Sequence, residues 1–216
     1  MTAAGRPPAP SLLDWRRRVA DLYAQVRRLG SGPALSTRTS TGTLREAHDL
    51  WRTGRDDLLR THPDSPLPPS ARAGFAGVQV DAYDRDLRFD VQLGDPGTGR
   101  RWEVATATDG TVPFDLLGTA ELPGLGVLDV WWLGSYGGGV FVPLRDPSPD
   151  TYGGGRYLLD TVKGADLGGD ALAGRLVLDL NFAYNPSCAY DPAWVCPLAP
   201  PGNTLAVAVR GGERTP

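Results

Sequence analysis

The stretch that organises the chain reads TYGGGRYLLDT at 151–161, LVLDLNFAYNPSCAYDPAWVCPLAPPGN at 176–203 and LAVAVRGGE at 205–213. It contains both cysteines of the chain, four of its seven tyrosines and a glycine triplet that leads into Arg156. Short apolar runs alternate here with Asn-Pro, Pro-Pro and Gly-Gly pairs, which mark turns. The stretch therefore predicts short strands joined by irregular loops, and it is where we expect a functional site.

Similar runs with a period of two precede this stretch. We expect nine short strands, at 77–80, 87–93, 101–107, 116–121, 126–133, 140–144, 156–162, 176–181 and 205–210. Turn signals such as DPGTG and LPGLG separate them, and no gap among the first seven is long enough for a crossover helix. The pattern predicts a mainly β fold, an antiparallel meander that closes into a barrel or folds into a sandwich, because an open sheet leaves two exposed edges.

One or two helices are expected before the strands. Ser11 and Thr43 are hydroxyl caps, and each precedes apolar residues at helical spacing. Between the two helical stripes the chain is rich in Gly, Pro, Ser and Thr. The sequence therefore predicts a disordered start, a helix and a linker over residues 1–42, and a single β-rich domain with a capping N-terminal helix over residues 43–216.

Bulk composition narrows the class of protein. The chain has 216 residues, 28 glycines and 20 prolines, and a formal net charge of −3 with scattered basic residues. That balance predicts no nucleic-acid partner. No apolar run reaches the length of a leader or a membrane span, so we expect a cytoplasmic protein with no membrane partner and reduced cysteines. Nothing in the sequence predicts an oligomeric state.

Three motifs resemble a known family. They are HPDSPL at 62–67, RDPSPDTYGGGRYLLD at 145–160 and LDLNFAYNPSCAYDPAWVCPLAPPGN at 178–203. Together they resemble the bacterial and archaeal family catalogued as domain of unknown function 1684, over roughly residues 46–213. The resemblance implies membership but no mechanism, since no activity is established for that family. Relatives often have Pro-Pro-Glu-Asn where this chain has Gly202, which implies that a carboxylate at that position is not needed here.

A set of polar and aromatic side chains could line a ligand pocket inside the β domain. The candidates are Arg156, Tyr157, Asp179, Asn181, Tyr184 and Asn185. Asp179 and Asn181 share a face if they lie in a strand. The structural alternative is that the asparagines and Tyr184 satisfy the backbone of the proline-rich loop. An inward Arg156 must pair with a carboxylate, with Glu213 or Asp179 as candidates, whereas an arginine exposed in a pocket would bind an anionic group.

Catalytic candidates are fewer. Cys188 could act as a nucleophile activated by His62, or Glu213 could act as a base. The alternatives for the thiols are a small disulfide loop between Cys188 and Cys196, or two buried structural cysteines. With only two histidines in the chain we predict no metal site and no cofactor.

Two functions remain open at this stage. The first is a cytosolic β-barrel that binds a small-molecule ligand. The alternative is a hydrolase or transferase that acts on a small polar metabolite through Cys188 or a carboxylate. Whether the protein is an enzyme is not decided by the sequence.

Overall fold

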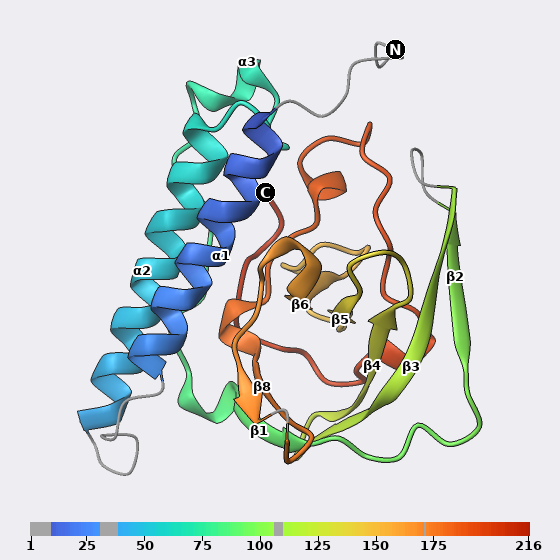
Figure 1. Ribbon diagram of the computed structural model, residues 1–216. Helices are drawn as coiled ribbons and strands as arrows, with labels where there is room; N and C mark the ends of the chain where they lie inside the picture. The colour runs from blue at the N-terminus through green and yellow to red at the C-terminus, as the bar shows by residue number, and fades with distance from the viewer. Residues whose placement is uncertain (1–9, 31–38, 106–109, 171) are drawn as a thin grey trace.

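The computed structural model describes residues 10–30, 39–105, 110–170 and 172–216. Helix α1 spans Pro10–Gly30, α2 spans Thr39–Thr61 and the short α3 spans Pro69–Arg72. The two long helices run in opposite directions along one side of the β-rich part (Figure 1). Helix α2 begins at Thr39 and not at the predicted cap Thr43. Of the predicted disordered start and linker, residues 1–9 and 31–38 lie outside the described residues.

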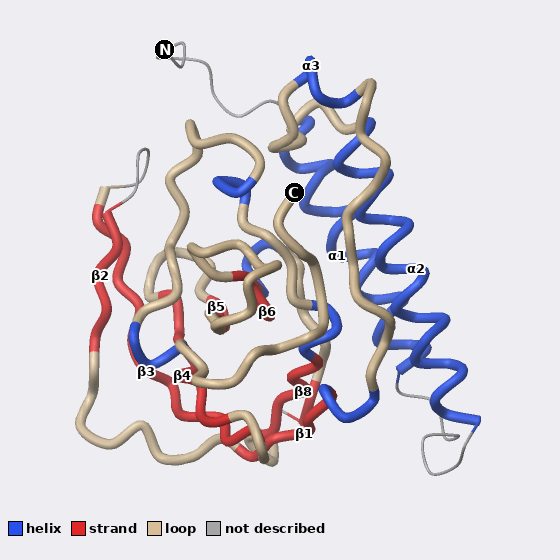
Figure 2. Tube along the Cα trace, turned by 180° about the vertical axis from the view of Figure 1, so that it is seen from behind, coloured by secondary structure: helices blue, strands red, loops and turns tan. Residues whose placement is uncertain are grey.

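The strands form two antiparallel sheets. The three-stranded sheet has the order β1–β8–β7, with bounds Arg88–Gln92, Arg175–Asp179 and Gly169–Asp170. The five-stranded sheet has the order β2–β3–β4–β5–β6, with bounds Arg101–Ala105, Thr111–Leu122, Gly126–Leu133, Gly139–Leu144 and Arg156–Asp160. Long loops encircle the short strands β5 and β6 (Figure 2). The predicted mainly β, antiparallel fold with N-terminal helices is confirmed.

Closure into a barrel is not found among the described residues. The five-stranded ladder ends at β2 and β6, and the two sheets are linked near β3 by an isolated bridge between Gly94 and Thr119. Two predicted strands do not form. Val80 makes only an isolated bridge to Glu213, and residues 205–210 run as bends and loop. Residues 106–107 of the expected strand at 101–107 lie outside the described ranges.

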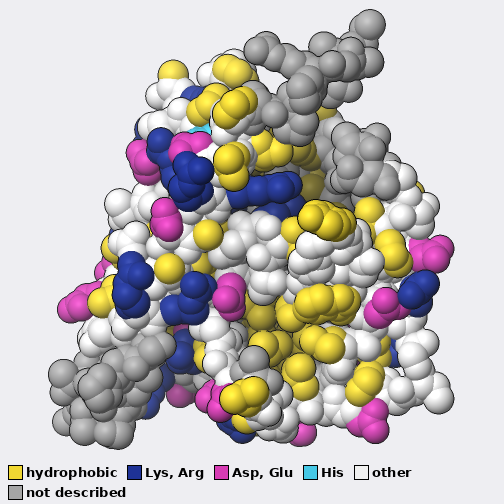
Figure 3. Space-filling view, in the orientation of Figure 1, with side chains coloured by type: hydrophobic (Ala, Val, Ile, Leu, Met, Phe, Trp, Pro, Cys, Tyr) yellow, Lys and Arg dark blue, Asp and Glu magenta, His cyan; other side chains and the backbone are white. Residues whose placement is uncertain are grey.

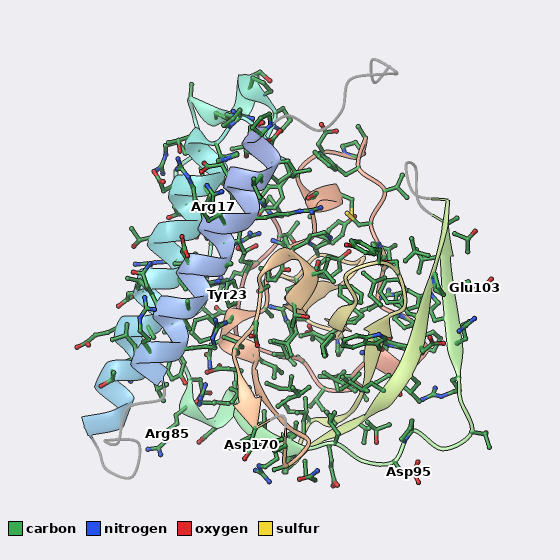
Figure 4. The ribbon with its side chains drawn as sticks, in the orientation of Figure 1. Arg17, Tyr23, Arg85, Asp95, Glu103 and Asp170 are labelled. Carbon is green, nitrogen blue, oxygen red and sulfur yellow. The ribbon has the colours of Figure 1, made fainter. Side chains whose placement is uncertain are left out.

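The main core lies between the helices and both sheets. Leu22, Tyr23 and Val26 of α1 are buried in it, and Tyr23 lies on the side of α1 that faces the β-rich part (Figure 4). The Trp51 indole of α2 donates a hydrogen bond to the Tyr23 hydroxyl at 3.2 Å. Gly54 lets the helices approach closely, since a Cβ there would lie 2.8 Å from a Leu22 methyl. Each buried apolar side chain of α1 contributes about 1.5–3 kcal/mol. The division of the chain at residue 42 stays a prediction.

A second, aromatic cluster packs on the five-stranded sheet. Its buried members are Phe114, Leu116, Trp131, Phe141 and Tyr157. The rings meet edge to face or tilted, for example Phe141 and Tyr157 with centroids 4.8 Å apart, which is a favourable arrangement for aromatic pairs. The side chains of Trp102 and Cys196 pack against the cluster. Through Cys196, this second cluster holds the loop that contains both cysteines, residues 187–197, against the sheet.

Candidate functional site

A buried ion pair links α2 to the C-terminal segment. Arg55 donates from two nitrogens to the carboxylate of Glu213, which is fully buried. That carboxylate also accepts hydrogen bonds from the Asn185 amide nitrogen of the backbone at 2.8 Å and from the Tyr190 hydroxyl at 3.0 Å. Burial alone would lower the pKa of Arg55, but Glu213 raises it above its ordinary value. Both oxygens of Glu213 are therefore engaged in holding the fold.

Arg156 lies in a second enclosed network. It pairs with Asp146 at 2.9 Å, and both side chains are 1% exposed. The same guanidinium donates to the backbone carbonyls of Gly211 and Glu213. The predicted pairing with the carboxylate of Glu213 or Asp179 is therefore wrong, because Asp146 is the partner and Glu213 offers only its carbonyl. The guanidinium serves to fasten the C-terminal segment to β6.

Asp179 and Asn181 meet at the end of β8. The Asn181 amide donates to Asp179 at 2.7 Å and also bonds both backbone groups of Asp84. Asp179 further accepts from the Tyr83 hydroxyl at 3.0 Å and from Arg88 at 3.3 Å. Burial raises the pKa of Asp179, and the hydrogen bonds from Asn181 oppose that rise. These contacts fit the structural alternative, in which the two residues satisfy local backbone and each other.

Tyr157, Tyr184 and Asn185 lie near one another, at the point where β6 meets the segment that follows β8. Tyr157 and Tyr184 form an isolated bridge, with both backbone bonds at 2.8–2.9 Å and ring centroids 5.8 Å apart. Burial raises the pKa of both hydroxyls. The Asn185 side chain donates to the Arg214 carbonyl at 2.7 Å. Tyr157 is a buried member of the aromatic cluster, and Tyr184 packs against that cluster.

A small cavity lies beside the aromatic cluster. It has a volume of about 60 Å³ and is lined by Phe114, Leu133, Gly139, Val140, Phe141, Asp160, Val162, Lys163 and Pro197. The Tyr157 hydroxyl donates to the Pro197 carbonyl at 2.8 Å and so holds one wall in place. The face in Figure 3 shows hydrophobic side chains gathered over the β-rich part, while many of the charged ones lie over the helices. The cavity is thus an apolar site with two polar residues at its edge.

Those two polar residues are Asp160 and Lys163. Asp160 ends β6 and caps the short 3-10 helix η3 (Thr161–Lys163) by accepting from the backbone amide of Lys163. The Lys163 ammonium lies 2.9 Å from the Asp160 carboxylate, with side chains 55% and 7% exposed. The carboxylate raises the pKa of Lys163, which keeps the only lysine of the chain positively charged. An ammonium has three donors, so this ion pair does not use up its bonding capacity.

The two thiols lie together. The backbone amide of Cys188 lies 3.4 Å from the Cys196 sulfur, and the Tyr152 hydroxyl lies 3.7 Å from the Cys188 sulfur. Both cysteines are free and half-buried. Burial raises the pKa of the Cys196 thiol. Cys188 therefore contacts a tyrosine and a second cysteine.

His62 makes its contacts elsewhere. Its ring lies 3.4 Å from the carboxylate of Asp14 and packs edge to face on Trp15, both on α1. Its other ring nitrogen accepts from the Asp64 amide at 3.1 Å. These contacts place His62 between the start of α1 and the end of α2. Within the described ranges, no group of three or more His, Cys, Asp or Glu residues is placed to hold a metal ion.

Sequence reasoning missed the residues that complete these clusters. They are Arg55, Asp146, Asp160, Lys163, Tyr152, Phe114 and Phe141. Lys163 carried a usable signal, since it is the only lysine beside many arginines and follows an aspartate three residues earlier. Arg55 and Asp146 carried none, because they meet their partners only through the tertiary fold.

The fold defines a mainly β protein of two antiparallel sheets with a helical layer. The family described as "Protein of unknown function (DUF1684)" matches residues 73–214, and the chain belongs to that family. An uncharacterised protein of Haloarcula marismortui, solved by NMR in solution, is similar with a TM-score of 0.56 and 30% identity, over 83% of this chain and 98% of that one. No curated protein matches the chain.

Proposed function

We propose that this protein binds a small organic anion with a short apolar body, and that the ligand sits in the cavity beside the aromatic cluster. The observation that carries the proposal is the position of Lys163. Its half-exposed ammonium stands at the edge of a cavity otherwise walled mainly by Phe114, Phe141 and other apolar side chains. Ligand sites commonly combine such walls with a few polar groups that fix orientation.

The charge at the cavity edge favours an anion over a cation. The Asp160 carboxylate is nearly buried and already accepts from the Lys163 ammonium and backbone amide. The ammonium, in contrast, keeps donors for a carboxylate that approaches from solvent, and a charge-assisted hydrogen bond of this kind is stronger than a neutral one. The ligand group that completes the site is therefore negatively charged.

The size of the cavity limits the apolar part of the ligand. A cavity of about 150 Å³ accommodates benzene in a protein interior, whereas this one has about 60 Å³. The buried part of the ligand is thus smaller than a benzene ring, as in a short-chain carboxylate. The rest of the molecule would extend toward solvent.

Binding has more support than turnover. The enzymatic alternative requires Cys188 or a carboxylate such as Glu213 to act on substrate. Glu213 is fully buried and held by Arg55. Cys188 contacts Tyr152 and Cys196, whereas His62 contacts α1. The described helices also contain none that is long and apolar enough to cross a membrane. The cytoplasmic location expected from the sequence stays a prediction, as does the absence of a nucleic-acid partner.

Isothermal titration calorimetry with acetate, butyrate and hexanoate tests the proposal. We expect measurable binding that is strongest for a chain of intermediate length, and none for butylamine. Val162→Phe, which fills the cavity, should abolish binding while the protein stays folded. Arg175→Met, which removes an exposed charge from the other sheet, should leave binding unchanged. Equal binding of butyrate by Val162→Phe and by the wild type would contradict the proposed site.

A further inference from the structure

The cysteine pair lies in a loop whose two ends are held by local hydrogen bonds. The Tyr190 and Asp191 amides both donate to the Ser187 carbonyl, at 3.0 and 3.2 Å. Farther along, the amides of Ala193 and Trp194 donate to Asp191, at 2.9 and 3.1 Å. The turns fold the loop back on itself. As a result, the two sulfur-bearing residues meet although eight positions separate them in sequence.

The Cys196 sulfur lies against the backbone of Cys188. The Cys188 backbone amide donates to the Cys196 sulfur at 3.4 Å. A disulfide requires its two Cα atoms within about 7 Å and side chains that point toward one another. The 3.4 Å contact turns the Cys196 side chain toward Cys188, as the second requirement asks. Both residues are partly exposed, which leaves them open to a small reagent.

We propose that Cys188 and Cys196 form a redox site that closes reversibly to an intramolecular disulfide by exchange with a low-molecular-weight disulfide. The inference rests on the geometry of the thiol pair alone and is independent of the anion site proposed above. The substrate class is a small organic disulfide, which is reduced to two thiols as the protein is oxidised.

The surroundings assign a different role to each sulfur. The Tyr152 hydroxyl lies 3.7 Å from the Cys188 sulfur, where it can donate a hydrogen bond to a thiolate. Cys196 packs on the aromatic cluster, and burial raises the pKa of its thiol. Cys188 is therefore the attacking residue and Cys196 the resolving residue.

The exchange has two steps. In the first, the Cys188 thiol loses its proton to solvent, and the thiolate attacks one sulfur of the reagent. The reagent's S–S bond breaks, a mixed disulfide forms on Cys188 and one reagent thiolate leaves and takes up a proton. In the second, the Cys196 thiol loses its proton and attacks the Cys188 sulfur, which releases the second reagent thiolate. Overall, the protein loses two protons and two electrons, and the reagent disulfide gains both.

Titration of the full chain with defined ratios of reduced and oxidised glutathione, read by intact-mass spectrometry, tests this site. We expect the wild type to lose the mass of two hydrogens without a lasting glutathione adduct. Cys196→Ser should accumulate a mixed disulfide on Cys188, because the resolving thiol is missing. Cys188→Ser should react several-fold more slowly at Cys196. Adducts alone on the wild type, or full reduction at every ratio, would overturn the proposal.

Two controls separate a built site from two accidental neighbours. In urea that unfolds the protein, the equilibrium constant for disulfide closure should fall about tenfold or more, because the folded chain brings the thiols together in advance. A native value equal to or below the unfolded one would overturn the proposal. In a Cys196→Ser background, Tyr152→Phe should slow adduct formation on Cys188 several-fold while far-ultraviolet circular dichroism stays unchanged. Equal rates with and without the tyrosine hydroxyl would contradict the role given to Tyr152.

Discussion

Two ion pairs at the ends of the same strand behave differently. At the start of β6, Arg156 and Asp146 are each 1% exposed and also bond the backbone around them. At the end of β6, the side chain of Asp160 is 7% exposed. It bonds Lys163, whose side chain is 55% exposed, beside a cavity. An enclosed pair that spends both terminal guanidinium nitrogens and its carboxylate on the surrounding chain holds the fold. A pair that opens to solvent on one side retains capacity for a ligand. The difference separates structural polar residues from candidate binding residues in this protein.

Breaking the enclosed pair should have the largest effect. Arg156→Met leaves Asp146 buried without its cationic partner, and such a loss costs about 3–5 kcal/mol. Urea unfolding followed by circular dichroism measures the change. The control is Arg175→Met, which removes the exposed pair with Asp90 and should cost under about 1 kcal/mol. Similar costs for the two variants would mean that Arg156 is not the structural fastener described here.

A substitution beside a second enclosed carboxylate, that of Asp129, should lower the free energy of unfolding by an intermediate amount. A Cβ on Gly202 would lie 1.8 Å from an oxygen of Asp129, a residue that is nearly buried and bonded to Arg100 at 2.6 Å. Gly202→Ala should therefore cost about 1–3 kcal/mol through overpacking. Gly99→Ala is the matched control, since a Cβ there meets nothing within 4 Å.

A double-mutant cycle attributes this cost to the contact with Asp129. In an Asp129→Ala background, the penalty of Gly202→Ala should shrink markedly, because the oxygen that the new methyl meets is gone. An unchanged penalty would show that the backbone, and not Asp129, sets the need for glycine at 202.

A smaller effect is expected from the pH dependence of stability at His48. This side chain is buried, and its ring nitrogen contacts the Asn181 carbonyl at 3.0 Å. Burial lowers the pKa of His48 below its ordinary 6.5. As the pH falls below about 6.5, the unfolded chain takes up a proton that the folded chain does not, so the free energy of unfolding decreases until the folded pKa is reached.

His48→Gln keeps a donor for Asn181 but cannot ionise. The variant should therefore lose less stability than the wild type between pH 7 and mildly acidic pH, as measured by urea unfolding at each pH. If both proteins lose the same amount, His48 is not held neutral by its burial.

Sequence patterns predicted several of the strands to within two residues. The expected strand at 126–133 coincides with β4, and the expected strands at 87–93 and 140–144 lie within two residues of β1 and β5. Apolar alternation and turn residues are local signals, so they are readable without the tertiary structure. Residues 205–210 alternate in the same way but form no strand, and the backbone of Val209 bonds the side chains of Arg156 and Asp146 instead of a neighbouring strand.

The contacts of the candidate site were harder to predict from the sequence. Arg156, Asn181 and Glu213 stood out as polar residues among strands. Their partners Asp146, Asp84 and Arg55 lie 10, 97 and 158 residues away, and no sequence spacing reveals the pairing. The cavity likewise depends on how β3, β5, η3 and the cysteine-containing loop meet. Of the sequence candidates, Tyr157 bonds the carbonyl of Pro197 in the wall of that cavity, and its role in ligand binding stays a prediction.

A chemical-shift titration of isotope-labelled protein with butyrate tests the central claim most directly. The account predicts saturable amide shifts that cluster at residues 139–141 and 160–163, the backbone that surrounds the cavity. The shifts should be lost in Lys163→Met, whose free energy of unfolding should differ from that of the wild type by under about 1 kcal/mol because the side chain is half-exposed. Shifts that cluster instead around Asn185 and Glu213, or that persist unchanged in Lys163→Met, would contradict it.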